Sequence, residues 1–226
     1  MYSIDHRSFL AATAILAVLS TALALGPVTT GPSEPKALPP PSLKGGMSLE
    51  EVLAQRRSTR QFVDKPLKLD EISQLCWAAE GITEPESGKR TAPSAGALYP
   101  MELYIVSADG LDHYLPKGHK LEHLLDGDQR PALKTAANGQ QTMGVAGATF
   151  VITAAFEKTA KKYGDSAERF CTLEAGHIAQ NILLQATALH LGCVPAGAFD
   201  ADQVAKALKL PSEQRVLYLV VVGRQR

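Results

Sequence analysis

An uncharged stretch is the feature that most constrains the fold of this chain. Residues 175–199 contain no Asp, Glu, Lys or Arg, and most of them belong to a predicted helix over residues 167–191 that Gly192 ends. A helix that is uncharged on nearly all sides is buried, either in the core of a domain or between subunits. Gly176, His177 and the side-chain amides that follow them argue against a membrane-spanning helix.

Two shorter helices are predicted upstream. Ser48 and Glu51 form a capping box that opens a helix ending at about Arg56. Asp70 is expected to cap a second helix, which has apolar side chains at helical spacing and which Gly81 ends. Both helices precede all of the strands that the sequence predicts.

Three segments rich in β-forming residues predict strands at residues 102–108, 149–155 and 216–222. The last two are nearly continuous apolar runs, which is typical of strands buried on both faces of a sheet. Asp200 caps a further short helix that Pro211 closes. There is no internal repeat and no sign of a second domain boundary, so one folded domain is expected.

Composition excludes several classes of protein. The 226 residues carry 23 basic and 23 acidic side chains, and a net charge of zero without a basic block offers no electrostatic footprint for nucleic acid or an anionic membrane surface. Cys76, Cys171 and Cys193 are too few and too scattered for a disulfide framework or a zinc cluster. Each is interpreted as a small buried apolar residue, and no metal site is expected.

Residues 1–25 have the layout of a secretory signal peptide. An uncharged run over residues 9–25 follows a polar start, and Ala22-Leu23-Ala24 offers small residues for cleavage. The alternative is a retained inner-membrane anchor, because the run is at the short limit for a membrane span. In either case we expect export to the periplasm, with the membrane as a partner only if the segment is retained.

Residues 26–46 are rich in proline and glycine. Proline fixes a backbone torsion and removes a hydrogen-bond donor, so this stretch is expected to be an extended linker rather than packed structure. The folded domain would then span residues 47–226. That length allows one core that buries roughly 70% of the unfolded chain's surface.

The first candidate binding motif is Arg56-Arg57-Ser58-Thr59-Arg60, where a predicted helix gives way to a turn. Three guanidiniums within this segment can bind a phosphate through paired donors. The Ser58 hydroxyl can bind a carbonyl or sugar-like oxygen. The alternative is a solvated basic turn without a ligand.

The second candidate is a loop of small residues over 88–100, directly before a predicted strand. It contains Pro93, Ser94, Ala95 and Gly96. Small residues let the backbone approach a flat ligand closely and place amide donors against its polar edge. A plain connecting loop is the alternative.

The third candidate is the C-terminal pair Arg224 and Arg226, which follows a predicted buried strand. The pair is interpreted either as a phosphate contact or as a frayed basic tail.

Five segments give the chain from about Glu51 to Gly223 a resemblance to a known family. They are RRSTR at 56–60, RTAPSAGALYPMELY at 90–104, KYG at 162–164, LEAGHIAQNILLQATALHLG at 173–192 and VVVG at 220–223. Each is weak alone, but they occur in the family's order across almost the whole domain. The chain resembles the nitroreductase superfamily of FMN-dependent oxidoreductases, and in particular its SagB-type dehydrogenase branch.

The resemblance implies an α+β, nitroreductase-like fold: a mixed central sheet wrapped by helices, in an intimate homodimer with two FMN sites at the subunit interface. The FMN-binding residues that it implies are Arg56, Arg57, Ser58, Arg60, Pro93, Ser94, Ala95, Gly96, Ala196, Gly197, Arg224 and Arg226. The arginines would hold the phosphate and the pyrimidine edge, and the 93–96 loop would lie along the rings. Residues 195–197 would approach flavin N5.

The resemblance also singles out Lys162 and Tyr163. In azoline-oxidising members of the SagB-type branch an adjacent lysine and tyrosine transfer protons while the flavin takes the hydride, which is sensible acid–base chemistry. The alternative is that Lys161-Lys162-Tyr163-Gly164 is an exposed helix end. His177 is interpreted as a buried, hydrogen-bonded histidine rather than a proton donor.

The expected activity is therefore a ping-pong hydride transfer through flavin N5 between a small-molecule electron donor and a flat conjugated acceptor. The nearer alternative is azoline or heterocycle oxidation by a SagB-type dehydrogenase. A flavin-binding module without turnover and a flavin-free exported binding domain are further alternatives. A secretion signal on a protein with a soluble cofactor is unusual, and no twin-arginine motif supports export of a prefolded holoprotein.

Overall fold

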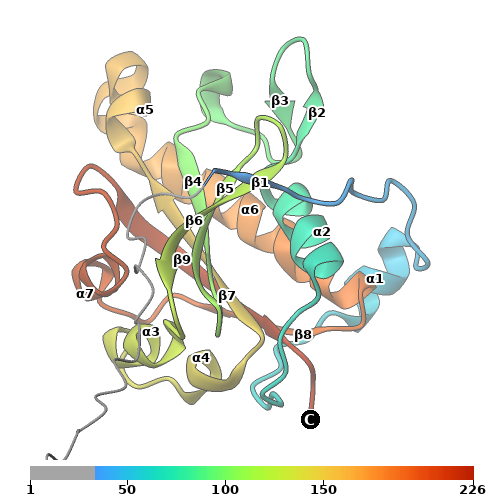
Figure 1. The fold of residues 1–226 in the computed structure, drawn as a ribbon. Helices are drawn as coiled ribbons and strands as arrows, with labels where there is room; N and C mark the ends of the chain where they lie inside the picture. Colours follow the sequence, from blue (N-terminus) through green and yellow to red (C-terminus); the bar gives the residue numbers. More distant parts are fainter. Residues whose placement is uncertain (1–33) are drawn as a thin grey trace, which may run out of the picture. The chain divides into compact units, whose positions relative to one another are not determined.

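The computed structural model describes residues 34–226, and a seven-stranded sheet lies at their centre (Figure 1). The strand order is β1-β6-β5-β4-β7-β9-β8. The bounds are β1 (Lys36–Ala37), β4 (Met101–Val106), β5 (Gly110–Leu115), β6 (Lys120–Asp126), β7 (Ala148–Ala154), β8 (Gly192–Ala196) and β9 (Arg215–Gly223). A separate hairpin is formed by β2 (Ile82–Glu84) and β3 (Lys89–Arg90).

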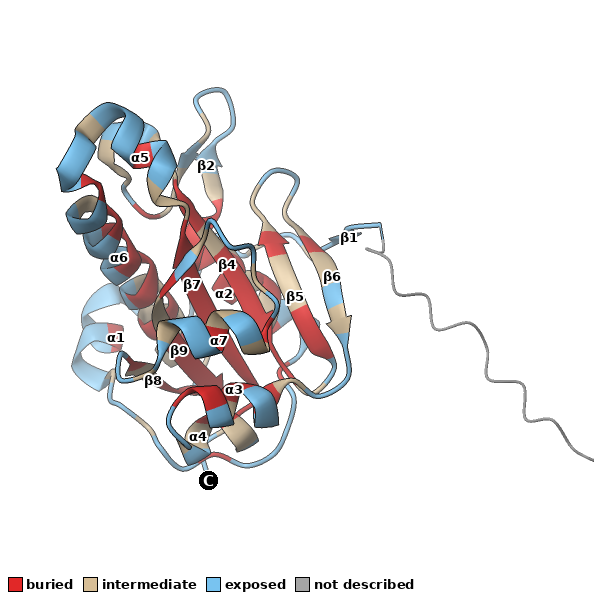
Figure 2. Ribbon diagram, turned by 90° about the vertical axis from the view of Figure 1, so that its left-hand side faces the viewer, coloured by how far each residue is buried: buried red, intermediate tan, exposed pale blue. Residues whose placement is uncertain are grey.

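Helices cover both faces of the sheet (Figures 1 and 2). They are α1 (Leu49–Gln55), α2 (Leu69–Glu80), α3 (Arg130–Ala136), α4 (Gln141–Val145), α5 (Phe156–Tyr163), α6 (Ala167–Ala188) and α7 (Ala201–Ala207). Phe150 and Ile152 of β7 pack beneath α2 and α6, whereas Val151 packs against α3, α4 and α7. Because successive strand residues point to opposite faces, a strand covered on both sides is apolar throughout, as predicted for β7 and β9.

The long helix that contains most of the uncharged stretch is α6, and it is buried on one side only within this chain. Ala175, Ile178 and Ile182 are buried against the sheet. On the opposite side Leu173 is 53% exposed, and His177 is also exposed. The interpretation of His177 as a buried histidine is therefore wrong for the single chain. An uncharged surface of α6 is left facing solvent.

The predicted α+β class is confirmed, with two corrections in detail. All neighbouring strands of the central sheet are antiparallel, and the parallel pairing that the described residues contain is an isolated bridge between Ser58 and Cys193. Lys68, not Asp70, is the N-cap of α2, because the Glu71 carboxylate accepts a hydrogen bond of 2.8 Å from the Lys68 amide. The capping box at Ser48 is as predicted.

The folded domain begins before the predicted boundary at Met47. β1 pairs with β6, and Leu38 is only 7% exposed, in the same core as α2 and α6. The Ser73 hydroxyl donates a hydrogen bond of 2.6 Å to the Pro39 carbonyl. The prediction that all of residues 26–46 form an unpacked linker is wrong for this part, because a proline-rich strand is tolerated at the edge of a sheet.

The predicted signal peptide or anchor, residues 1–25, lies outside the described residues. Within residues 34–226, no helix is both long enough and apolar enough to cross a membrane.

The packing of the N-terminal segment yields a test with a matched control. Leu38→Ala deletes a buried side chain and should lower the free energy of unfolding by about 2–4 kcal/mol. Leu43 lies five residues on and is 78% exposed, so Leu43→Ala should change it by less than about 0.5 kcal/mol. Urea denaturation of the two variants measures both values. Equally small effects would mean that the segment does not contribute to the folded domain.

Candidate active site

The small-residue loop between β3 and β4 has an unusual backbone. Gly96, Ala97 and Tyr99 have φ values of 61°, 54° and 47°, in the left-handed region that non-glycine residues rarely adopt. The Tyr99 amide donates a hydrogen bond of 2.9 Å to the Ser94 hydroxyl, which closes the turn. At the start of the loop, the Thr91 amide donates a hydrogen bond of 2.9 Å to the carbonyl of Gly81, the residue that follows α2. This backbone therefore depends on fixed polar contacts.

Lys162 and Tyr163 both lie against this loop, although more than sixty residues separate them from it. A methyl group at Gly96 would be 2.8 Å from the Lys162 Nζ atom and 2.7 Å from the Tyr163 Oη atom. α5 ends at Tyr163, whose ring packs edge-on against Phe170 of α6. The fold thus brings together two of the motifs that the sequence singled out, and only a glycine leaves space between them.

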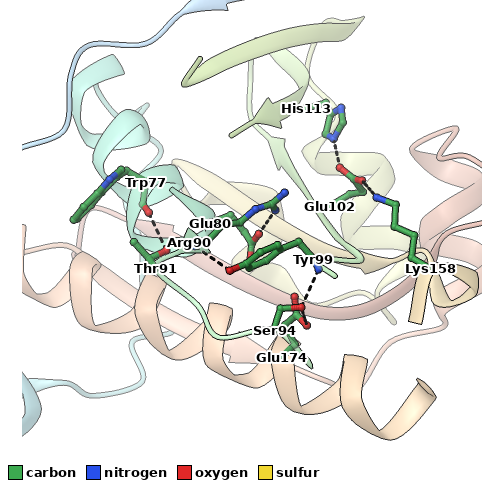
Figure 3. A network of polar contacts seen from close by, with 10 residues as sticks. All are labelled: Trp77, Glu80, Arg90, Thr91, Ser94, Tyr99, Glu102, His113, Lys158 and Glu174. Atoms are coloured by element: carbon green, nitrogen blue, oxygen red, sulfur yellow. Dashed lines mark hydrogen bonds and ion pairs between the residues drawn. The ribbon is translucent and has the colours of Figure 1, made fainter. Parts of the chain in front are cut away.

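A network of polar contacts connects the loop to α2 and α6 (Figure 3). Arg90 forms an ion pair with Glu80, at the end of α2, and its guanidinium lies 4.6 Å from the centroid of the Tyr99 ring. The Arg90 amide donates a hydrogen bond of 3.2 Å to the Tyr99 hydroxyl. The Ser94 hydroxyl donates one of 2.7 Å to the Glu174 carboxylate on α6.

Both carboxyl groups of this network titrate near neutral pH. Burial raises the pKa of Glu80 to about 7, although the charge of Arg90 acts in the opposite direction. Burial likewise raises the pKa of Glu174 to about 7, against the hydrogen bond from Ser94. The sequence analysis missed Glu80, Arg90 and Glu174. One signal was present for Glu174, since it is an acidic residue directly before the uncharged stretch of the long helix.

The arginine-rich turn lies at the other end of the sheet order, against edge strand β8. The Thr59 amide donates a hydrogen bond of 2.8 Å to the Cys193 carbonyl, and Ser58 bridges to the same residue. Within residues 34–226, no carboxylate pairs with the side chains of the motif's arginines, which are Arg56, Arg57 and Arg60. The backbone is therefore fixed while these three cations stay available for an anion.

The C-terminal residues lie beside this turn, but only one of the two predicted arginines is available. The Val63 amide donates to the Arg224 carbonyl at 3.1 Å, and the Arg226 amide donates to the Gln61 carbonyl at 3.2 Å. The Arg224 guanidinium donates two hydrogen bonds to Glu71, of 2.6 and 2.8 Å. Arg224 is thus paired with a carboxylate while Arg226 is exposed, and phosphate binding by either arginine stays a prediction.

Ala196 and Gly197 close strand β8, on whose first residues the arginine turn docks. Ala196 pairs with Leu219 of β9 and is buried, whereas Gly197 is exposed. The turn and the small-residue loop are attached to different parts of α6. Cys193 Sγ lies 3.6 Å from the Leu183 carbonyl, and Ser94 binds Glu174, nine residues earlier. Nine residues of helix correspond to about 14 Å, so the two halves of the candidate site do not coincide within one chain.

Comparisons with known proteins agree with this α+β architecture. A family model described as the nitroreductase family matches residues 53–224. The chain belongs to the nitroreductase family, and the resemblance inferred from the sequence is confirmed. Among residues 34–226, no group of three His, Cys, Asp or Glu side chains is arranged to hold a metal ion.

Three relatives illustrate the match. A Methanocaldococcus jannaschii protein named as a nitroreductase is 39% identical over 185 residues, which are 79% of this chain and 92% of the relative. A crystal structure from Ralstonia eutropha, also named as a nitroreductase, superposes with a TM-score of 0.78 at 30% identity and covers 86% of this chain and 90% of its own. The microcin B17-processing protein McbC of Escherichia coli is 27% identical over 71% of this chain and 63% of its own length.

The two buried carboxyls make stability depend on pH in a defined direction. Because their pKa values lie above the ordinary 4.5, the folded chain binds more protons than the unfolded chain between about pH 4.5 and 7. The free energy of unfolding should therefore fall as the pH rises through this window. Glu80→Gln should reduce that fall by up to roughly 3 kcal/mol, measured by urea denaturation at pH 5 and pH 8.

Glu84→Gln is the control for this measurement. Glu84 is exposed, and the hydrogen bond with Lys89 lowers the pKa of its carboxyl, so it titrates below the window. The slope between pH 5 and 8 should be the same as in the wild type. A Glu80→Gln variant with the wild-type slope would contradict the assignment of a raised pKa to Glu80.

Proposed function

We propose that this nitroreductase-family chain is an FMN-dependent oxidoreductase that moves hydride through flavin N5 between a small-molecule donor and a flat conjugated acceptor. The observation that carries the proposal is the convergence of Lys162 Nζ and Tyr163 Oη on Gly96 of the small-residue loop. It places two proton-transfer groups beside a stretch of backbone that a flat ring system can approach.

The residues present fit FMN at both of its ends. Arg56, Arg57 and Arg60 offer planar guanidiniums without carboxylate partners in the described structure, which suits a phosphate and the electron-rich pyrimidine edge. The loop from Pro93 to Gly96 offers backbone and small side chains to the rings. FMN, when bound, would supply the two-electron acceptor and donor, and a cation near its N1 favours the reduced form.

The chain's own residues would handle the protons. Lys162 is exposed and Tyr163 half-buried, with the Lys162 ammonium 5.4 Å from the centroid of the Tyr163 ring. Either side chain can hold a proton at a substrate atom on the Gly96 side of the loop. During oxidation of a substrate the pair would take up the proton that leaves with the hydride, and during reduction it would return one.

We also propose a homodimer, because large apolar side chains are exposed on both α1 and α6. Leu49 and Leu53 of α1 are 60% and 51% exposed, and Leu173 of α6 is 53% exposed. A groove of about 420 Å³ lies between these helices, lined by Leu49, Trp77, Leu184 and their neighbours. Exposed apolar surface of this kind marks an interaction site. A second copy bound at this surface would bring its own half of the candidate site close to that of the first chain. Analytical ultracentrifugation tests for the dimer by measuring the mass of the assembly.

The periplasm remains the proposed location, and it rests on the sequence of residues 1–25 alone. An exported enzyme would need an electron donor outside the cytosol, and membrane quinol or a reductase partner has the required chemistry. Anaerobic reduction of the FMN-loaded protein with NADH, NADPH and a quinol in turn identifies the donor.

The second candidate function is oxidation of an azoline or related heterocycle, with the flavin taking the hydride. Two observations favour it: the 27% identity to a microcin-processing protein and the position of Lys162 and Tyr163 at the loop. A flavin-binding module without turnover is the alternative outside enzymology. A bound flavin that neither reductants nor acceptors can cycle would favour that module.

The arginine turn gives a prediction for cofactor affinity. Arg56→Ala and Arg60→Ala should each weaken FMN binding by about tenfold, because each removes charge-assisted hydrogen bonds to an anion. Arg215→Ala is the control, since this exposed arginine pairs with Glu168 away from the turn. Fluorescence titration of FMN with apoprotein measures the dissociation constants. Wild-type affinity in both turn variants would remove the arginines from the cofactor site.

The loop contact gives a prediction for turnover. Lys162→Ala and Tyr163→Phe should each lower kcat by about a hundredfold while FMN binding stays at the wild-type level, because a proton-transfer group contributes to the rate and not to cofactor affinity. Lys161→Ala, one residue away, is the control and should keep the wild-type kcat. Steady-state rates with a quinone, a nitroaromatic and a thiazoline test both candidate functions. Unchanged rates with the two acceptors, and with the thiazoline as the substrate to be oxidised, would exclude the pair from the mechanism.

A further inference from the structure

Glu174 is a deeply buried charged side chain that contacts the candidate loop at Ser94. It is only 3% exposed on α6, and its Oε2 atom accepts the hydrogen bond of 2.7 Å from the Ser94 hydroxyl. Its Oε1 atom is buried without a hydrogen-bond partner. A buried carboxylate that is only half satisfied costs stability, so its presence calls for a functional reason.

The Ser94 hydroxyl links Glu174 to the far end of the turn. Its hydroxyl donates to Glu174 and at the same time accepts from the Tyr99 amide at 2.9 Å. One carboxyl on a rigid helix thus fixes the first residue of the turn directly and the last one through a single oxygen atom (Figure 3). Between these two points lie Gly96 and Ala97, with their left-handed backbone.

The turn has few other polar anchors inside the described structure. The Ala97 amide donates to the Ser94 carbonyl at 3.0 Å, which is a contact within the turn itself. Outside it, Tyr99 is held by Arg90, through its amide and its guanidinium. Left-handed conformations of non-glycine residues cost about 1–2 kcal/mol each, so loss of the Glu174 contact should let the turn relax.

The charged groups around Glu174 come from two other elements. Arg90 of β3 attracts the ionised form, and Glu80 at the end of α2 is close enough for the two carboxyls to repel each other. Glu102 of β4 adds a weaker repulsion on Glu80. Burial raises the pKa of Glu174 to about 7 against the hydrogen bond from Ser94 and the charge of Arg90, so Glu174 changes its protonation state within the ordinary range of working pH.

We propose that Glu174 is a positioning residue: through Ser94 it holds the 94–99 turn in the form that presents Gly96 to Lys162 and Tyr163, and it holds it more firmly when ionised. This rests on the proposed function, since the turn is taken as the surface along which the flavin rings lie. A hydrogen bond to a carboxylate is stronger than one to a neutral carboxyl group. FMN should therefore bind more tightly when Glu174 is ionised than when it is protonated.

The test uses Glu174→Gln, which keeps the shape and an acceptor oxygen but cannot ionise. At pH 8 it should weaken FMN binding by the apoprotein by about tenfold relative to the wild type. At pH 6, where wild-type Glu174 is largely protonated, the difference should shrink to less than about twofold. Comparing the two proteins at each pH cancels the titration of the FMN phosphate itself. An equal factor at both pH values would overturn the proposal.

Ser94→Ala shows whether the effect runs through the serine hydroxyl. At pH 8 it should reproduce the loss of affinity, and adding Glu174→Gln to it should weaken binding no further, because both changes break the same link. Additive losses would mean that Glu174 acts by another route. Glu168→Gln is the control, since this exposed acidic residue on the same helix pairs with Arg215 and should leave FMN affinity at the wild-type value.

A readout without FMN separates this inference from the proposed function. Amide hydrogen exchange of residues 94–99 in the apoprotein should be several-fold faster in Glu174→Gln than in the wild type at pH 8, with the Tyr99 amide affected most. Unchanged exchange would overturn the positioning role even if FMN binds. If exchange is faster in the variant but the wild-type protein binds no FMN, the proposed function is refuted, whereas the positioning role of Glu174 is supported. Ser94→Ala gives the same measurement if Glu174→Gln fails to fold.

Discussion

The packing of α6 against the central sheet is the constraint on which the rest of the structure depends. Apart from Glu174, its inner side is apolar and packs against β7, β9 and α2, which fixes the rotation of the helix about its axis. That rotation decides which residues meet which neighbours. Glu174 faces the small-residue loop, while Leu173 and His177 face outward. One helix therefore sets both the support of the candidate site and the surface proposed for dimerisation.

The candidate site combines rigid supports with a strained loop. Helix ends at Glu80 and Tyr163, strand β3 at Arg90 and the body of α6 at Glu174 surround a short segment of left-handed backbone. Stored strain of this kind persists only where the surroundings over-determine it. In one chain the arginine turn is attached to β8, which contacts α6 at Leu183. This contact lies about 14 Å along the helix from Glu174, which is why a second chain is proposed to complete the site.

The sequence predicted the elements whose signals are local. The capping box at Ser48, the apolar strands β7 and β9 and the long helix α6 follow from periodicity and end signals, and they are where the patterns place them. What the sequence did not predict has physical causes. The proline-rich residues near Leu38 were interpreted as a linker, although the short edge strand β1 lies among them. The pairing of Arg224 with Glu71 joins residues 153 positions apart, which no local pattern reveals. The Glu80–Arg90–Glu174 network arises only when three elements meet.

Both edges of the sheet are partly covered by short or irregular segments in the described structure. β6 is covered by the two residues of β1, and β8 is covered by the bridge from Ser58 and the amide of Thr59. An open edge would invite another polypeptide to extend the sheet and grow into fibrils. Partial cover of this kind shortens the free stretch of edge that another strand could join, which lowers the risk of strand-by-strand aggregation in a concentrated solution.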